Sequence, residues 1–266
     1  MGPWLIAGPV VAAGFASFTA YGAVHPRAQV FGATLFRTPH PQQLALTFDD
    51  GPNPTVTPKL LDLLDHHQAK ATFFLIGKYV RESPALVKET AARGHLLGNH
   101  TDSHPNLFFC GPAETRDELL RCSEAIQQAA SLEPRWFRPP FGFRSPWLGG
   151  IVHSQGMRTV MWSLLPGDWR KKPSDWLITR MQLIADHARH DLQSHANAGH
   201  PAGVAPASSR PALAGDVLCL HDGYHAAQNA DRTRTLAALE FWLPRWRDLG
   251  LEFVTISQAA GKAVEG

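Results

Sequence analysis

The 266-residue chain is long enough for one large domain with a sizeable core, or for two small ones. Hydrophobic residues make up 44% and charged residues 18%, ordinary values for a globular enzyme, and 14 His against 3 Tyr draw attention to metal or acid–base chemistry. The formal net charge of +2 shows no nucleic-acid or polyanion signature, so no nucleic-acid partner is expected.

The three cysteines, Cys110, Cys122 and Cys219, are too few for a disulfide framework and have no zinc-finger spacing. Cys110 and Cys122 could pair in an exported chain, and two free thiols are an equal alternative. The redox compartment therefore stays open.

The first predicted segment is an uncharged, Ala- and Gly-rich stretch over residues 3–24. Such a stretch can span a bilayer, although its Gly and Pro residues weaken it, so we expect a membrane anchor over 1–25 and a connector over 26–43. A buried or surface apolar helix is the alternative. We expect a membrane-anchored or exported enzyme with an extracytoplasmic catalytic domain, but Arg27 and Arg37 would by the positive-inside rule hold it in the cytoplasm.

Beyond residue 40, short apolar runs alternate with amphipathic helical patterns. Strands are predicted at 44–48, 71–76, 95–98, 135–138, 158–162, 217–220 and 252–255. Helices are predicted at 57–68, 84–93, 112–130, 174–189 and 231–248. This alternation favours a parallel sheet covered by helices, and seven strands indicate a barrel or barrel-like α/β fold over 44–262.

Residues 190–215 break the pattern, because they are rich in Ala, Ser, Gly, Pro and His without an apolar period. We predict a long surface loop inserted in the catalytic domain. Its His190, His195 and His200 have no acidic partner nearby in the sequence, so we expect them to be exposed to solvent.

Charged and imidazole side chains follow five of the predicted strands. They are Asp49 and Asp50 after the first strand, His100 and His104 after the third, Arg138 at the fourth, Asp168 and Trp169 past the fifth, and His221 and Asp222 after the sixth. The carboxyl ends of parallel strands share one face, which in barrels carries the active site. Each motif alone could be an ordinary turn or a chance pair, but their agreement predicts a site.

In the stretch LALTFDDGP, Asp49 and Asp50 end an apolar run, although Asp is disfavoured in strands and adjacent anions repel each other. Two neutral imidazoles and one carboxylate make a site for a divalent metal that leaves positions open. Such an ion lowers the pKa of water and polarises a carbonyl. One Asp would then ligate the metal and the other accept a proton, with the Gly51-Pro52 turn letting both face one cavity.

A base beside a metal must stay ionised and be held in place, which the permanently charged Arg138 can do. We expect Asp168 to orient Arg138 in turn. His221, on the opposite side, would donate a proton to the leaving group. Metal, base and acid together indicate a hydrolase.

The ordered motifs TFDDGP, HTDSHP, RPPFG, DW and LHD resemble those of the polysaccharide deacetylases, the NodB-homology family of carbohydrate esterases. The resemblance covers roughly residues 40–260. It implies a distorted (β/α)7 barrel, here with an N-terminal apolar helix, and metal-dependent removal of N-acetyl, or sometimes O-acetyl, groups from sugar polymers.

By resemblance, each motif residue takes a role. Asp50, His100 and His104 match the metal ligands, Asp49 the catalytic base, His221 the catalytic acid, Arg138 the arginine that positions the base and Asp168 its supporting carboxylate. Phe141 matches the residue whose backbone N–H holds the oxyanion, and Pro139, Trp169 and Leu220 match the substrate-binding wall. Two positions depart from the family: Phe141 replaces a common Tyr, and Cys219 replaces a Leu that lines the acetyl-methyl pocket.

Two other functions compete with polymer deacetylation. One is a deformylase or deacetylase of a lipid-linked sugar at the membrane, and the other is a carbohydrate-binding relative without turnover. The polymer itself stays open among chitin oligomers, peptidoglycan and exopolysaccharide. The expected cofactor is one divalent ion, zinc first, with cobalt, nickel or manganese as alternatives.

Overall fold

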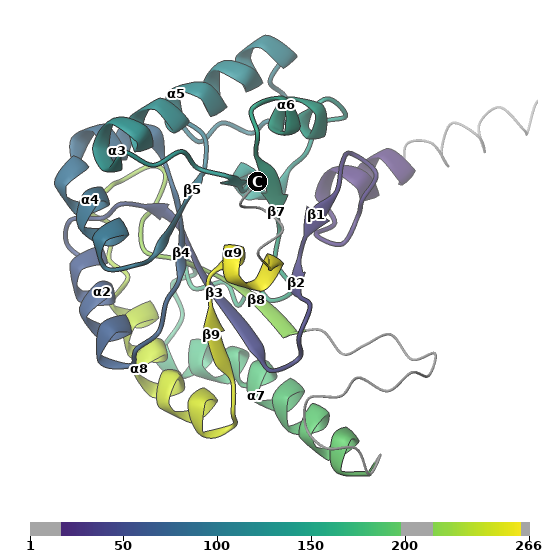
Figure 1. Cartoon of the computed structure of the whole chain (residues 1–266), viewed down its shortest axis with the longest axis vertical. Coiled ribbons are helices and arrows are strands. Elements are labelled where there is room, and N and C mark those ends of the chain that lie inside the picture. Colours follow the sequence, from purple (N-terminus) through teal and green to yellow (C-terminus); the bar gives the residue numbers. More distant parts are fainter. Residues whose placement is uncertain (1–16, 198–214, 262–266) are drawn as a thin grey trace, which may run out of the picture.

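The structure is a computed structural model that describes residues 17–197 and 215–261. A strongly curved sheet forms a nearly closed barrel, with helices α2 to α8 covering its outer face (Figure 1). The α/β barrel predicted from the strand–helix alternation is thereby confirmed.

All seven predicted strands are present and pair in parallel. They are β3 (Gln43–Gly51), β4 (Thr72–Leu75), β5 (Leu96–Asn99), β6 (Trp136–Phe137), β7 (Arg158–Val160), β8 (Gly215–His221) and β9 (Glu252–Val254). The order of these strands in the sheet is β7-β6-β5-β4-β3-β8, with β9 beside β3. The barrel therefore brings together the carboxyl ends of β3, β5, β6 and β8, as the site prediction requires.

Two short strands in the expected connector at 26–43 were not predicted. They are β1 (Thr34–Leu35), parallel to β7, and β2 (Arg37–Thr38), antiparallel to β8. The expected connector is therefore part of the barrel. Three of their four residues, Thr34, Arg37 and Thr38, are polar, so no apolar run marks these strands in the sequence.

The barrel closes where the chain beyond β7 meets β8. Leu164 forms a parallel bridge with Leu218, and the Cys219 N–H donates to the Leu164 carbonyl at 2.9 Å. Because of this contact, the segment after β7 runs beside β8 toward the rim of the barrel, where the strands end.

Five helices match the predicted ones: α2 (Thr57–His66), α4 (Pro84–Ala92), α5 (Pro112–Ala130), α7 (Ser174–Asn197) and α8 (Thr233–Asp248). Four shorter elements were not predicted: α3 (Gly77–Glu82), the 3-10 turn η1 (Pro140–Gly142), α6 (Leu148–Ser154) and α9 (Ile256–Ala260). Elements of one or two turns are too short to show a helical period.

Alternating side chains of the long strand β3 supply two different cores. Leu44, Leu46 and Phe48 pack outward with the covering helices, whereas Ala45 packs with residues of β4, β6 to β9 and α9. Burying each large apolar side chain contributes about 1.5–3 kcal/mol. Because strand side chains alternate, Thr47 and Asp49 share the inner face with Ala45.

The prediction of a loop over 190–215 is wrong for its first part, because α7 continues to Asn197. Residues 190–197 include Leu, Gln and Ala, which favour helix, and no Pro or Gly interrupts them. His190 is exposed, as predicted. The His195 side chain, His200 and the rest of the predicted loop lie outside the described part of the chain.

Most of the expected membrane anchor lies outside the described residues. Its described part, residues 17–24, is helical. Within 17–197 and 215–261, no helix combines the length and the apolar character needed to cross a bilayer.

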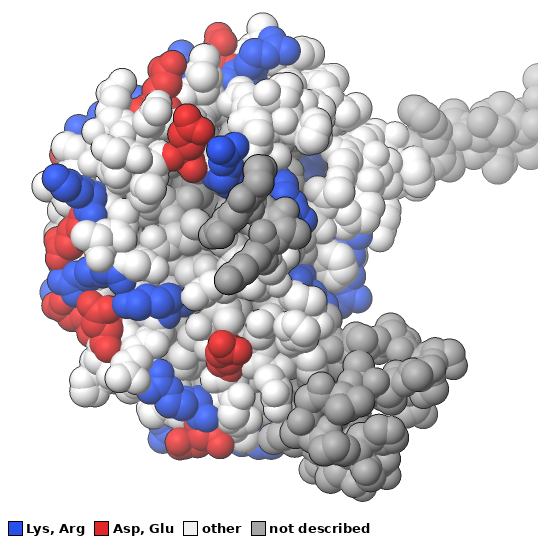
Figure 2. All heavy atoms as spheres, viewed as in Figure 1, with Lys and Arg blue, Asp and Glu red and all other residues white. Residues whose placement is uncertain are grey.

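On the face seen in Figure 2, acidic and basic side chains are interspersed. Among the ion pairs of the described residues, Arg93 pairs with Asp62, Asp65 and Glu89.

Candidate active site

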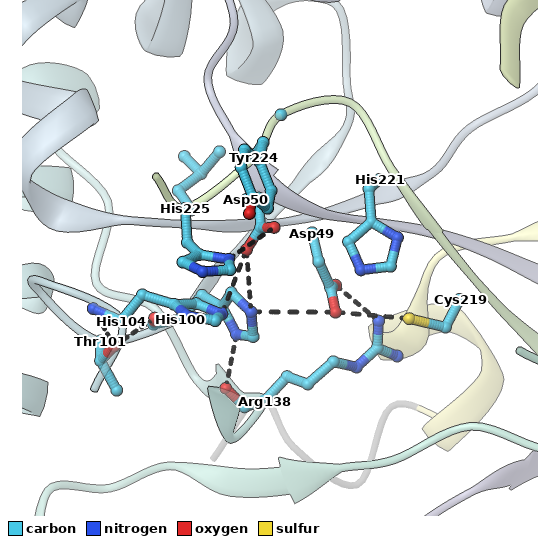
Figure 3. A network of polar contacts seen from close by, with 12 residues as sticks. Asp49, Asp50, His100, Thr101, His104, Arg138, Cys219, His221, Tyr224 and His225 are labelled. Atoms are coloured by element: carbon cyan, nitrogen blue, oxygen red, sulfur yellow. Dashed lines mark hydrogen bonds and ion pairs between the residues drawn. The ribbon is translucent and has the colours of Figure 1, made fainter. Parts of the chain in front are cut away.

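The predicted rim residues meet around one cavity of about 240 Å³ at the carboxyl ends of the strands (Figure 3). The cavity is lined by Asp49, Asp50, His100, His104, Pro139, Phe141, Gly142, Trp162, Leu165, Trp169, Cys219, His221, Tyr224, His225 and Arg232. The expected metal ligands, base, acid and aromatic wall are all among them. Arg138 and Asp168 lie directly behind this surface.

Both adjacent carboxylates face the cavity because the backbone changes conformation at Asp50. Its φ is 69°, in the left-handed region that Asp tolerates better than most residues, and the pairing of β3 with β4 shifts register between Asp49 and Gly51. We expected the Gly51-Pro52 turn to do this. Instead the irregularity lies inside the strand, one residue earlier.

Two of the predicted metal ligands, His100 and His104, converge on the carboxylate of the third, Asp50. The Asp50 Oδ1 lies 3.2 Å from His104 Nε2 and 3.6 Å from His100 Nε2. His100 Nδ1 donates to the Arg138 carbonyl at 2.7 Å, which leaves the Nε2 lone pair turned toward Asp50. Asp50 Oδ1 is buried and has no hydrogen-bond partner among the described residues.

The charge states of this cluster suit a cation. Burial, and then the neighbouring His100, lowers the pKa of His104 to about 3, so its ring is neutral. Burial alone would raise the pKa of Asp50, but His100, His221 and His104 hold it well below its usual range. A neutral His104 ring beside the ionised Asp50 carboxylate is the form that binds a divalent metal, so these residues fit the expected ion.

His104 lies on a turn and not on a helix, because the following Pro105 disfavours helical backbone at His104. Its φ is 64° and that of Thr101 is 66°, and the His104 N–H donates to Thr101 Oγ1 at 3.1 Å. Glu118 on α5 accepts from the backbone N–H groups of Asp102 and Ser103 at 3.0 and 2.8 Å. A helix packed outside the barrel thereby holds the turn that carries His104, an expected metal ligand.

Arg138 holds Asp49, as predicted. Its Nη1 donates to Asp49 Oδ1 and to Thr47 Oγ1, both at 2.7 Å, and its Nη2 donates to the Met161 carbonyl at 3.0 Å. The guanidinium is fully buried and lies 4.3 Å from the centre of the Phe74 ring. The second oxygen of Asp49 faces the cavity, 3.3 Å from the Cys219 thiol.

The expectation that Asp168 orients Arg138 is wrong. Asp168 Oδ1 lies 2.8 Å from His221 Nδ1, and its Oδ2 accepts from the His221 N–H at 2.8 Å and from Thr235 at 3.0 Å. The reason is the barrel closure, which carries the segment after β7 alongside β8. Asp168 therefore positions the predicted acid and not the base.

This pairing sets the charge of the His221 ring. Burial alone would lower the pKa of His221, but the Asp168 carboxylate raises it to about 9. Burial would raise the pKa of Asp168, and His221 lowers it instead. The pair is therefore an imidazolium and a carboxylate near neutral pH, and His221 carries a proton to give.

The expected substrate wall is largely present. Pro139, Phe141 and Trp169 line the cavity, with the Phe141 ring 4.6 Å from that of His104 and the Trp169 ring 5.0 Å from that of His221. Leu220 is wrong as a wall residue: it is buried in the outer core, because alternate residues of β8 face opposite sides.

The apolar wall also includes Trp162 and Leu165, which the sequence did not single out. Cys219, at the position that departs from the family, lines the cavity as expected.

All three cysteines are free and buried, so Cys110 and Cys122 do not pair.

His225 and Tyr224 were missed. The His225 ring stacks on His104 with centroids 4.5 Å apart, and burial lowers its pKa. The sequence does contain a signal for His225. His221 and His225 have the same H-x-x-x-H spacing as His100 and His104.

Asp222 was noted at the rim but given no role. Its buried carboxyl contacts the Thr57 hydroxyl, and burial raises its pKa to about 7. Asn53 donates to the Asp222 carbonyl at 2.9 Å, which ties the chain after β3 to the end of β8.

Comparison with known proteins matches the polysaccharide deacetylase family model to residues 36–160. The chain is 34% identical over 220 residues to a chitooligosaccharide deacetylase of Bradyrhizobium sp. (strain ANU 289), covering 80% of this chain and 88% of the relative. It is 34% identical over 215 residues to a peptidoglycan-N-acetylglucosamine deacetylase of Bacillus cereus, covering 81% and 86%. A crystal structure of the Bc1960 peptidoglycan N-acetylglucosamine deacetylase superposes with a TM-score of 0.68 and 30% identity, covering 85% of this chain and 92% of that one.

Proposed function

The chain belongs to the polysaccharide deacetylase family, whose members are hydrolases, and we propose that it removes N-acetyl groups from an amino-sugar glycan with the help of one divalent metal ion. The observation that carries this proposal is the Asp50–His104–His100 cluster beside a second, arginine-held carboxylate. Removal of an O-acetyl group would use the same residues.

Asp50, His100 and His104 would hold the ion, through the Asp50 carboxylate and the two histidine Nε2 atoms that lie near its Oδ1. The buried and unpartnered Asp50 Oδ1 supports this, because an ionised oxygen without a hydrogen bond is costly unless a cation binds it. When bound, a divalent ion supplies Lewis acidity to the amide carbonyl and to the attacking water. Zinc suits this nitrogen and oxygen set, and cobalt, nickel and manganese are alternatives.

Asp49 acts as the general base. Arg138 donates a hydrogen bond to Asp49 Oδ1. The other oxygen, Oδ2, faces the cavity and can take the proton of the attacking water. The backbone N–H of Phe141 donates to the oxyanion that develops on the substrate carbonyl.

His221 acts as the general acid. Its ring is held by Asp168 on one side and reaches the cavity on the other, so it can give its proton to the departing sugar amine. The acetate then leaves. Trp169, Phe141 and Pro139 pack against the sugar ring and the acetyl group.

The relatives' names indicate the substrate class: they act on chitooligosaccharides and on peptidoglycan N-acetylglucosamine. Either glycan, or an acetylated exopolysaccharide, would present an N-acetyl group to this cavity. For the whole chain we propose a catalytic domain through residue 262, preceded by a membrane anchor within residues 1–25 that holds the enzyme outside the cytoplasm.

A lipid-linked amino sugar at the membrane is the alternative substrate, which the apolar N-terminal stretch favours. A carbohydrate-binding relative without turnover is disfavoured, because the residues that we propose as metal ligands, base and acid all line the cavity.

The test is acetate release by the full chain from a panel of chitooligosaccharides, peptidoglycan, acetylated exopolysaccharide and membrane lipid extract. We expect release from an N-acetylglucosamine polymer or oligomer, loss after dialysis against a chelator, and recovery with zinc or cobalt. Release confined to the lipid extract would replace the polymer with a lipid-linked sugar. Release that a chelator does not affect would contradict the metal-dependent mechanism.

A further inference from the structure

A third imidazole reaches the proposed metal cluster from the loop after β8. The Nδ1 of His225 lies 3.9 Å from Asp50 Oδ2 (Figure 3). One ligand atom from each of Asp50, His104 and His225 lies within 4.8 Å of the other two. A nitrogen donor is therefore within reach of the position that an ion bound to Asp50 and His104 would occupy.

The backbone of His225 is held by α3, while its side chain is partly exposed and packs against the rings of His104, Phe141 and Tyr224. Lys78 Nζ and Tyr79 Oη, both on α3, donate to the His225 carbonyl at 2.9 Å. The side chain itself is 30% exposed, at the edge of the cavity. Rotation about its Cα–Cβ and Cβ–Cγ bonds can therefore turn a ring nitrogen from its stacked position on His104 toward the ion.

We propose that His225 is a fourth protein ligand of the metal, in addition to Asp50, His100 and His104. This inference rests on the metal-dependent function proposed above. An added imidazole favours zinc, cobalt or nickel over manganese or magnesium, which prefer oxygen ligands. It also fills one of the coordination positions that three protein ligands would leave open, so fewer remain for water and substrate.

The experiment separates a donor nitrogen from a stacked ring. Metal-free protein is titrated with Zn²⁺ against a chromophoric chelator, for the wild type and for His225→Phe, His225→Ala, His104→Ala and His153→Ala. Phe keeps an aromatic ring to stack on His104 but has no donor. His153 is an exposed histidine on α6 and controls for surface binding.

We expect both His225 variants to bind Zn²⁺ at least roughly tenfold more weakly, with His153→Ala unchanged. The visible spectrum of the Co²⁺ form should also differ between the wild type and His225→Phe, because loss of a ligand changes the coordination. Wild-type Zn²⁺ affinity and an unchanged Co²⁺ spectrum in His225→Phe would overturn the proposal, whatever His225→Ala does. Wild-type affinity in His104→Ala would instead contradict the underlying metal site.

Discussion

Asp49 and Asp50 are adjacent in the chain and differ in almost every contact. One oxygen of Asp49 accepts a hydrogen bond from the buried guanidinium of Arg138, while Asp50 faces the imidazoles of His100 and His104 and has an oxygen without a hydrogen-bond donor. Like charges this close repel each other by several kcal/mol when partly buried. Arg138 on one side, and the proposed cation on the other, would offset that repulsion.

Replacing Arg138 by Met should strongly destabilise the metal-free protein. The change leaves the Asp49 carboxylate buried without its partner, and we expect a loss of about 3–5 kcal/mol in the free energy of unfolding. Urea denaturation measures it. Adding Asp49→Asn to Arg138→Met should recover part of the loss, because the unpaired charge is then absent. Strictly additive losses in the double variant would contradict a coupled pair.

Replacing Asp168 by Asn should lower the pKa of His221. The folded-state pKa of about 9 lies above the ordinary 6.5, so protonation of His221 stabilises the fold fully below about 6.5. That contribution is lost as pH rises through about 9. Without the Asp168 carboxylate, burial of the ring dominates and the pKa falls. NMR titration of the imidazole in metal-free protein measures both values.

Two results would contradict this account of His221. One is a wild-type imidazole that titrates near 6.5, and the other is a titration that Asp168→Asn leaves in place. Arg138→Lys, which alters the neighbouring Asp49 pair instead, serves as the comparison and should move the His221 titration less.

Among the elements, α5 contributes to the site without lining the cavity. Its Glu118 is buried and accepts two backbone N–H groups of the turn that carries His104. Outer contacts of this kind fix the orientation of a metal ligand. The helix therefore links the packing outside the barrel to the geometry of the rim.

Replacing Glu118 by Ala should weaken Zn²⁺ binding by roughly tenfold, because the turn loses the acceptor that fixes it. Chelator competition on metal-free protein measures the change. Glu124→Ala, an exposed position on the same helix, should bind as the wild type does. Equal affinities for both variants would mean that the turn holds its shape without Glu118.

Much of the element plan could be predicted, because long strands and helices have local periods. The position of Leu220 could have been predicted from the sequence. Strand side chains alternate, so if His221 faces the cavity, its neighbour Leu220 must face the outer core. Asp168 illustrates the opposite case. Its partner depends on how the chain after β7 pairs with β8, a contact between distant segments that no local pattern encodes.

For the molecule as a whole, the barrel explains how separate motifs form one site. The strands of a parallel barrel end on a shared rim, which is why residues from five segments could be assigned to one cavity from the sequence. The fine geometry could not be, since the left-handed conformation of Asp50 and the approach of His225 depend on packing around the completed barrel.

The division of labour between the two carboxylates is the central claim, and Asp49→Asn tests it most directly. Acetate release from a chitooligosaccharide is compared for variant and wild type at equal zinc content, verified by elemental analysis. We predict retained zinc and a rate reduced by about 10²- to 10⁴-fold, the usual contribution of a general base. A near-wild-type rate in a zinc-loaded Asp49→Asn protein would contradict the account.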